Sequence, residues 1–297
     1  MVWKEKIMIK VTILGTAATM PLPERALTAA VLNCNGHTIL FDCGEGTQSA
    51  ARKAGVSLMK CEIIALTHFH GDHIFGLPGL LQTMSCLGRQ SKLTIIGPKG
   101  IEEALRPIME LSGELTYEVS IQEMREPIHI FPEATLSCFK TKHRCQSIGY
   151  SFTLDRPGIF QVDKATELGV DKEDWGKLQH GISVGKVSPE MVLGEKRKGL
   201  KVVFSGDTMP CDELEKAAED ADLFICEATY AEDEHTEQAE NYGHMTFSQA
   251  CRTGRKAART VLVHFSQMIE DPEIYELSGN AEVGTDGMQI ILDFEQR

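Results

Sequence analysis

Residues Thr67-His68-Phe69-His70-Gly71-Asp72-His73 place three histidines and a carboxylate directly after an apolar run in this 297-residue chain. Imidazole and carboxylate are ligands that Zn²⁺ prefers in proteins. If residues 61–67 form a strand, the loop after it can present His68 and His70 on one side, and Asp72 and His73 on another. Solvated histidines in a polar loop are the alternative, but charged imidazoles this crowded repel each other. The stretch therefore predicts two adjacent metal half-sites.

Three other predicted strands also end close to a side chain that can bind a metal. His143 follows the strand expected at 135–140, Asp207 follows 201–204, and His264 follows 260–263. A single histidine after a strand is most often a surface group. Open α/β architectures nevertheless build their sites from groups at strand ends, so we expect these side chains to join the first cluster.

Asp42 ends a further predicted strand, at 37–41, and precedes a glycine-containing turn and a helix expected at 49–54. A carboxylate at this position suits a group that orients a metal-bound histidine through a hydrogen bond. Asp42 could instead cap the helix. The local sequence allows both interpretations.

The remaining pattern alternates strands and helices, which predicts an α/β fold. The expected strands lie at 8–14, 26–33, 92–96, 117–121, 128–131, 223–225 and from 148 through Thr153, and the helices at 76–87, 100–111 and from Thr246 to about 257. Thr246 is the expected N-cap of the last helix, and the acidic stretch 232–240 is helical or disordered.

Composition places the chain among globular proteins. Hydrophobic residues make up 42% of it, which is ample for a packed core, and no uncharged apolar run is long enough to span a membrane. Nine cysteines without any C-x-x-C pair favour reduced thiols in a cytoplasmic protein over a disulfide framework.

The formal net charge of −13 is unevenly distributed. Residues 205–243 carry thirteen acids and a single base, Lys216, whereas the rest of the chain holds 29 bases and 30 acids. A chain that is nearly neutral outside one segment can still present a local basic face, so the net charge does not exclude a nucleic-acid substrate.

The pattern changes between residues 154 and 200, where eight acids and eight bases cancel. We expect this segment to lack enough apolar residues for its own core and to project as an insertion. An exposed Trp175 together with Lys196, Arg197 and Lys198 suits contact with an RNA base or backbone. A solvated linker with one packing tryptophan is the alternative.

Arg25 lies in a loop that Pro21 and Pro23 stiffen, so we expect an exposed turn that presents this side chain. A solvated loop charge without a role would give the same local sequence.

The H-x-H-x-D-H pattern at 68–73 resembles the signature of the metallo-β-lactamase superfamily, and the whole chain resembles its ribonuclease Z family in the short form. The motifs that carry the second resemblance lie at 41–48, 97–100, 227–229 and 243–246. The resemblance implies a metallo-β-lactamase fold, an αββα sandwich of two mixed sheets flanked by helices. It further implies a single domain over 1–297 in which 154–200 is an inserted flexible arm, a tRNA-gripping exosite. The loop with Pro21 and Arg25 also resembles the family's substrate-binding loop, which implies that Arg25 binds substrate.

The resemblance also implies the roles of individual residues. His68, His70 and His143 would bind one Zn²⁺; Asp72, His73 and His264 would bind a second; Asp207 would bridge the two. Asp72 would also act as the base. His244, paired with Glu227, would lie over the scissile phosphate and would either stabilise the phosphorane-like charge or protonate the leaving oxygen. His244 could instead be a surface residue at a helix start.

The implied reaction is zinc-dependent cleavage of the 3′ trailer from precursor tRNA, by metal-hydroxide attack that leaves a tRNA 3′-hydroxyl. A homodimer is implied as well, with the arm of one subunit presenting tRNA to the other. Cys226, where the family usually has histidine, and 170–174, which lacks the common Gly-Pro pair, depart from the pattern.

Two other functions fit parts of the sequence. Another metallo-β-lactamase-fold hydrolase would act on small phosphodiesters or thioesters and would not need the insertion. A non-catalytic RNA-binding scaffold would not need seven candidate ligands.

Overall fold

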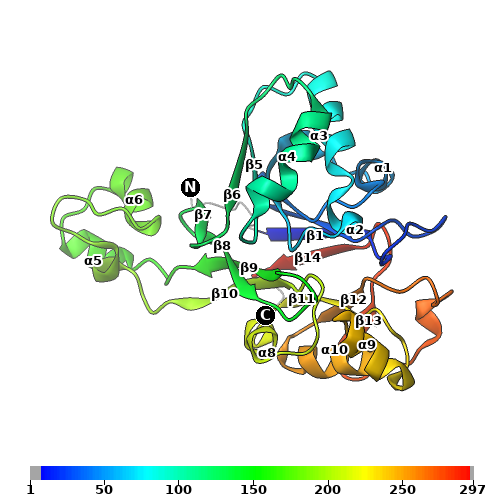
Figure 1. Ribbon diagram of the computed structural model, residues 1–297. Coiled ribbons are helices and arrows are strands. Elements are labelled where there is room, and N and C mark those ends of the chain that lie inside the picture. The colour runs from blue at the N-terminus through cyan, green and yellow to red at the C-terminus, as the bar shows by residue number, and fades with distance from the viewer. Residues whose placement is uncertain (1–7, 295–297) are drawn as a thin grey trace.

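Two seven-stranded β-sheets pack face to face in the computed structural model, which describes residues 8–294. Helices cover the outer face of each sheet, so the layers run helix, sheet, sheet, helix (Figure 1). The predicted sandwich of two mixed sheets flanked by helices is therefore confirmed.

The first sheet has the order β14-β1-β2-β3-β4-β5-β6. Its strands are β1 (Met8–Gly15), β2 (Ala29–Cys34), β3 (His37–Phe41), β4 (Cys61–Ala65), β5 (Leu93–Gly97), β6 (Val119–Glu123) and β14 (Gln289–Asp293). Pairs from β14 to β3 are antiparallel, and pairs from β3 to β6 are parallel.

The second sheet has the order β13-β12-β11-β10-β9-β8-β7. Like the first sheet, it has a parallel half and an antiparallel half. Its strands are β7 (Ile128–Phe131), β8 (Ala134–Lys140), β9 (Ile148–Arg156), β10 (Arg197–Phe204), β11 (Leu223–Glu227), β12 (Thr260–Val263) and β13 (Ala281–Val283). The strands β10 to β13 are parallel, so β10, β11 and β12 end at the same edge.

Short helices fill the connections. On the first sheet they are α1 (Thr47–Lys53), α2 (Gly71–Ile74), α3 (Leu77–Cys86) and α4 (Ile101–Ser112); on the second they are α8 (Asp212–Ala218), α9 (Thr236–Tyr242) and α10 (Phe247–Thr253). Single 3₁₀ turns lie at Leu58–Lys60, Lys172–Asp174, Asp233–His235, Gly254–Lys256 and Pro272–Ile274. None of the helices in residues 8–294 has both the length and the apolar character needed to cross a membrane.

The core between the sheets follows the two-residue period of the strands. Tyr150 and Phe41, from opposite sheets, are fully buried there, and the ring of Phe41 stacks on Phe204 at 5.3 Å. Burying each such side chain contributes about 1.5–3 kcal/mol. The Tyr150 hydroxyl donates to the carbonyl of Leu66 at 2.8 Å, which fixes the loop after β4 against the second sheet.

The insertion leaves the body between β9 and β10 and projects from it (Figure 1). It contains α5 (Val162–Glu167), α6 (Trp175–Gln179) and α7 (Pro189–Val192). The expectation that it has no core is wrong, because Ala165, Leu178 and Val192 are fully buried in a cluster of their own. Three short helices facing one another suffice to enclose these side chains.

The expected exposure of Trp175 is also wrong. Trp175 packs against this small cluster and against Phe160, and its indole N–H donates to the carbonyl of Val170 at 3.1 Å. Its ring therefore helps to hold the arm together.

Candidate metal centre

All seven predicted ligands lie at the ends of strands, where the edges of the two sheets meet. The loop after β4 carries His68 and His70, and the short helix α2 that follows it carries Asp72 and His73. The other three follow strands of the second sheet, His143 after β8, Asp207 after β10 and His264 after β12. The site thus joins the two halves of the sandwich.

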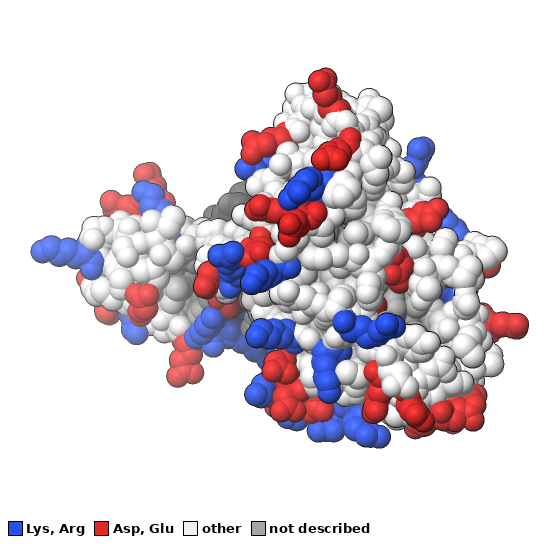
Figure 2. Space-filling view, in the orientation of Figure 1, with Lys and Arg blue, Asp and Glu red and all other residues white. Residues whose placement is uncertain are grey.

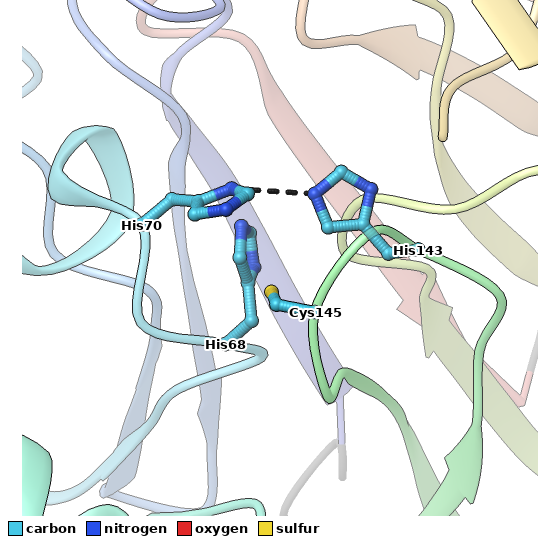
Figure 3. A group of neighbouring side chains, drawn as sticks. All are labelled: His68, His70, His143 and Cys145. Atoms are coloured by element: carbon cyan, nitrogen blue, oxygen red, sulfur yellow. Dashed lines mark hydrogen bonds between the residues drawn. The ribbon is translucent and has the colours of Figure 1, made fainter. Parts of the chain in front are cut away.

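The first half-site is formed by His68, His70 and His143. Figure 3 shows the rings of His70 and His143 reaching toward each other from separate loops, with His68 beside them. His70 Nδ1 lies 3.2 Å from His143 Nε2. Two nitrogens bound to one tetrahedral Zn²⁺ are about 3.3 Å apart, so this spacing suits two ligands of one ion.

The second half-site is formed by Asp72, His73 and His264. The Nε2 atoms of the two histidines are 3.3 Å apart. Oδ2 of Asp72 lies 3.7 Å from His73 Nε2 and 3.6 Å from His264 Nε2. These three atoms surround a common point, as ligands of one cation do.

Asp207 lies between the half-sites and presents one oxygen to each. Oδ1 is 3.3 Å from Nε2 of both His73 and His264, and Oδ2 is 3.6 Å from His68 Nε2. A carboxylate shared in this way holds two cations close together.

Two buried atoms of the cluster, His68 Nε2 and Asp207 Oδ1, have no hydrogen-bond partner. Leaving a buried polar atom unpaired costs about 1–3 kcal/mol. Because both atoms point into the cluster, cations held there would satisfy them, and the residues present fit a pair of metal ions.

The protonation states of five of the seven proposed ligands also suit metal ligation. Burial lowers the pKa of His68, His70 and His143, and for His68 the charge of His73 adds to this effect. Burial alone would raise the pKa values of Asp72 and Asp207, but the neighbouring histidines outweigh it and hold both well below their usual range. Neutral imidazole and ionised carboxylate are the forms that bind metals.

The pKa of His73 shifts in the opposite direction. Burial would lower it, but Asp207 and Asp42 face the ring and raise it well above its ordinary value. Two carboxylates on one buried imidazole favour positive charge at this position.

Asp42 orients this cluster from behind. Its Oδ2 accepts from His73 Nδ1 at 2.8 Å, and its Oδ1 accepts from the backbone N–H of Thr67 at 2.8 Å. The alternative that Asp42 caps α1 is wrong, since the N-cap of that helix is Gly46. Asp42 lies at φ 56°, a strained conformation that the two hydrogen bonds help to maintain.

Two threonines that sequence reasoning missed link histidines to buried carboxylates. Thr67 Oγ1 lies 3.0 Å from His68 Nδ1 and 2.9 Å from Asp42 Oδ2. Thr229 Oγ1 lies 3.0 Å from both His264 Nδ1 and Glu227 Oε2. With Nε2 facing the metal, each Nδ1–H donates to a threonine, which in turn donates to the carboxylate.

Two glycines permit the close approach of the loops. A Cβ on Gly206, at φ 60°, would lie 2.7 Å from the side chain of Thr67, and one on Gly243, at φ 80°, would lie 2.8 Å from His143 Nδ1. The carbonyl of Gly243 accepts a hydrogen bond from that same Nδ1 at 2.8 Å, which orients His143.

His244 lies beside the metal cluster, with its ring 5.0 Å from that of His143 and 5.3 Å from that of His264. Its Nδ1 is 2.8 Å from Oε1 of the buried Glu227. Burial would lower the pKa of His244, but the charge and hydrogen bond of Glu227 outweigh it and raise the pKa to about 9. The alternative of a free surface residue at a helix start is therefore wrong.

Comparison with known proteins places this geometry in a family. A family model described as anti-Pycsar protein Apyc1 matches residues 9–280, which include the whole cluster. The ribonuclease Z of Agathobacter rectalis is 41% identical over 302 residues, which cover 97% of this chain and 100% of the relative. The chain belongs to the ribonuclease Z family.

Two solved structures have the same architecture as this ribonuclease Z family member. Human tRNase Z, short form, is 29% identical, with a TM-score of 0.68 and coverage of 95% of this chain and 98% of the other. The metallo-β-lactamase fold protein YhfI from Bacillus subtilis is 20% identical, with a TM-score of 0.67 and coverage of 96% and 100%. The predicted metallo-β-lactamase fold is confirmed.

Cys226, which departs from the usual ribonuclease Z pattern, does not face the cluster. It is fully buried in the core between the second sheet and its helices, near Cys251, whereas its neighbour Glu227 faces the site. Burial raises the pKa of Cys226 well above its ordinary value, which keeps the thiol protonated.

The predicted substrate-binding residues lie outside the cluster. Arg25 is half-buried rather than presented to solvent, and its guanidinium donates to the carbonyl of Ile269. At the base of the arm, Lys196 pairs with Asp155 at 2.9 Å, Arg197 Nε donates to the carbonyl of Pro157 at 2.9 Å, and Lys198 is exposed in β10. Strand β10 begins four residues earlier than expected, so Arg197 and Lys198 belong to it.

Proposed function

We propose that this protein is a zinc-dependent endoribonuclease that removes the 3′ trailer from precursor tRNA and leaves a 3′-hydroxyl. The observation that carries the proposal is Asp207, whose Oδ1 faces His73 and His264 while its Oδ2 faces His68. The substrate class, precursor tRNA, follows from the membership of the chain in the ribonuclease Z family.

In this proposal, two Zn²⁺ ions occupy the half-sites. His68, His70 and His143 would hold one ion, Asp72, His73 and His264 would hold the other, and Asp207 would bind both. When bound, the metal pair supplies an activated water and positive charge against the phosphodiester. His70 is exposed, so the first half-site opens toward solvent and substrate.

Asp72 and His244 accept and donate the protons that the reaction transfers. Asp72 is ionised and able to accept a proton from the attacking water, and its Oδ2 is held by the N–H of Thr19 at 2.8 Å. His244 is the acid: it donates its Nε2 proton to the oxygen that leaves the phosphate. Glu227 keeps that imidazole protonated at neutral pH and fixes its Nδ1.

The segment 154–200 is the proposed substrate arm of a single-domain enzyme that spans residues 1–297. Figure 2 shows several Lys and Arg side chains around the junction of the arm and the body, with Asp and Glu side chains among them, and the positive side chains there suit contact with a phosphate backbone. Substrate contact by Arg25, Trp175, Lys196, Arg197 and Lys198 remains a prediction.

We further infer that the enzyme works as a homodimer in the cytoplasm. The arm projects away from the body, in a position from which it can serve a partner. The nine cysteines are all free, which suits a reducing compartment.

The test is incubation of the zinc-loaded protein with precursor tRNA that carries a 3′ trailer, followed by mapping of the cut and of its end groups. We expect one cut at the trailer junction with a 3′-hydroxyl on the tRNA, and no cut by an Asp207→Asn variant. Hydrolysis of bis(p-nitrophenyl) phosphate without pre-tRNA cleavage would instead favour a hydrolase of small phosphodiesters.

A further inference from the structure

Cys145 lies at the edge of the first half-site, two residues after His143 on the loop between β8 and β9. Its Sγ and the ligand nitrogens of His68, His70 and His143 all lie within 4.8 Å of one another. Figure 3 shows the sulfur of Cys145 beside the His68 ring. His68 and His70, which follow β4, lie on one side of the sulfur, and His143 lies on the other.

The donors converge on one point from two loops. Ligand atoms that share a Zn²⁺ through bonds of about 2.0–2.3 Å lie within about 4.5 Å of each other, so small adjustments bring all four onto one ion. His68 Nε2, which is fully buried and has no hydrogen-bond partner, points into the same space and independently indicates a cation there.

We propose that Cys145 binds the metal ion of the first half-site through its sulfur, which adds a thiolate to the three imidazoles and the Asp207 carboxylate oxygen proposed for that ion. This inference rests on the proposed function for the presence of a metal there. On binding, the S–H bond breaks, a sulfur–metal bond forms and the proton passes to solvent.

A thiolate changes which metal the half-site prefers. Thiolate is a soft ligand that favours zinc, cobalt and cadmium, whereas manganese and magnesium prefer oxygen. The first half-site therefore selects thiophilic ions, while the second half-site, with Asp72 and two histidines, does not have this preference. The two positions should fill in a fixed order when zinc is limiting.

Cobalt substitution tests the proposal by a readout that does not depend on activity. The Co²⁺-loaded wild-type protein should show a thiolate-to-cobalt charge-transfer band in the near ultraviolet. Cys145→Ser should abolish the band, whereas Cys86→Ser, which removes an exposed thiol at the end of α3, should keep it. In chelator competition, Cys145→Ser should bind one of its two zinc ions roughly tenfold or more weakly, with manganese affinity unchanged.

Alkylation provides a second measurement on the same proteins. Zinc should slow modification of Cys145 by iodoacetamide, read by peptide mass spectrometry, and should leave Cys86 in the same sample unaffected. Equal labelling of Cys145 with and without zinc, or a charge-transfer band that survives in Cys145→Ser, overturns the proposal.

The outcomes separate this inference from the proposed function. A wild-type protein that cleaves pre-tRNA and binds two cobalt ions without the band refutes only the cysteine ligand. A protein that shows the band but leaves pre-tRNA intact refutes only the tRNA assignment.

Discussion

At His244, burial and a buried carboxylate act in opposite directions on one imidazole. Burial would lower its pKa, and Glu227 at 2.8 Å raises it, with a net result of about 9. Glu227 is itself held by the N–H groups of Thr208, Thr229 and Met245. The Glu-Ala-Thr and Gly-His-Met-Thr motifs therefore meet around one carboxylate that keeps an acid charged.

This arrangement predicts the alkaline limb of the pH profile. Only protonated His244 can act as the acid, so kcat/KM for pre-tRNA should fall as pH rises through about 9. Glu227→Gln removes the charge that raises the pKa, so less imidazolium remains at a given pH. The limb should then move down by about one to three pH units.

Measurements of kcat/KM against pH check this shift, with zinc content verified in each sample. Glu110→Gln, on an exposed position of α4, serves as the control and should keep the wild-type profile. An unchanged limb in Glu227→Gln would show that another group titrates there.

The leaving group provides a second prediction for His244. A ribose oxygen is a poor leaving group that needs a proton, whereas p-nitrophenolate leaves without one. His244→Ala should therefore lower kcat for pre-tRNA by about 10²–10⁴-fold and change kcat for bis(p-nitrophenyl) phosphate far less. Metal analysis should still find two ions, and a metal loss equal to that of His70→Ala would assign His244 to the ligands instead.

The arm distinguishes an enzyme that processes RNA from a hydrolase of small molecules, because only the RNA substrate is large enough to need it. Arg156 at the end of β9 is the register partner of Arg197 at the start of β10. Residues 157–196 can therefore be replaced by Asn-Gly, which closes a two-residue hairpin. This excision should reduce kcat/KM for pre-tRNA roughly tenfold or more and leave bis(p-nitrophenyl) phosphate hydrolysis within about threefold of the wild type.

A point variant provides the matched test of the arm. Leu178→Asp places a charge in the buried cluster of Ala165, Leu178 and Val192 and should unfold the arm without shortening the chain. Pre-tRNA cleavage should fall in both variants. Equal losses on both substrates in the excised protein would contradict the exosite role.

The sequence predicted elements best where local chemistry marks both ends. The strand 37–41 and the N-cap Thr246 were predicted correctly, and Thr246 forms a capping box with Gln249. Strand β14 was missed because it pairs with β1 across nearly the whole chain, as in Met8 with Asp293, and no local pattern reports such a partner. His68, His70 and His73 were predicted from a dense motif, whereas Thr67 and Thr229 act through contacts that only folding creates.

On the scale of the whole molecule, the metal cluster joins the two halves of the sandwich. Four of its proposed ligands follow β4 in the first sheet, and three follow strands of the second. The ligands converge only in the folded state, so bound metal should stabilise that state by about 2.7 kcal/mol at a free zinc concentration 100-fold above Kd.

For a chain of this size, that free energy corresponds to a rise in Tm of about 4 °C for each bound ion. Differential scanning calorimetry of the chelator-treated protein with and without zinc measures it. Asp207→Asn should show a smaller rise, and His129→Ala, outside the cluster, should show the full rise. A Tm that does not respond to zinc would refute the assignment of the cluster as a metal site.

The proposed dimer, in which the arm of one subunit serves the site of the other, predicts complementation between two impaired proteins. An arm-excised chain keeps its metal site, and an Asp207→Asn chain keeps its arm. Mixed dimers should combine one intact arm with one intact site across the interface. If subunits exchange freely, half of the dimers are mixed and one of their two sites is productive, so pre-tRNA cleavage should recover to about a quarter of the wild-type value.

Light scattering establishes that the mixture is dimeric, and a mixture of two Asp207→Asn preparations is the control. Mixed dimers that stay inactive would mean that each arm serves its own subunit.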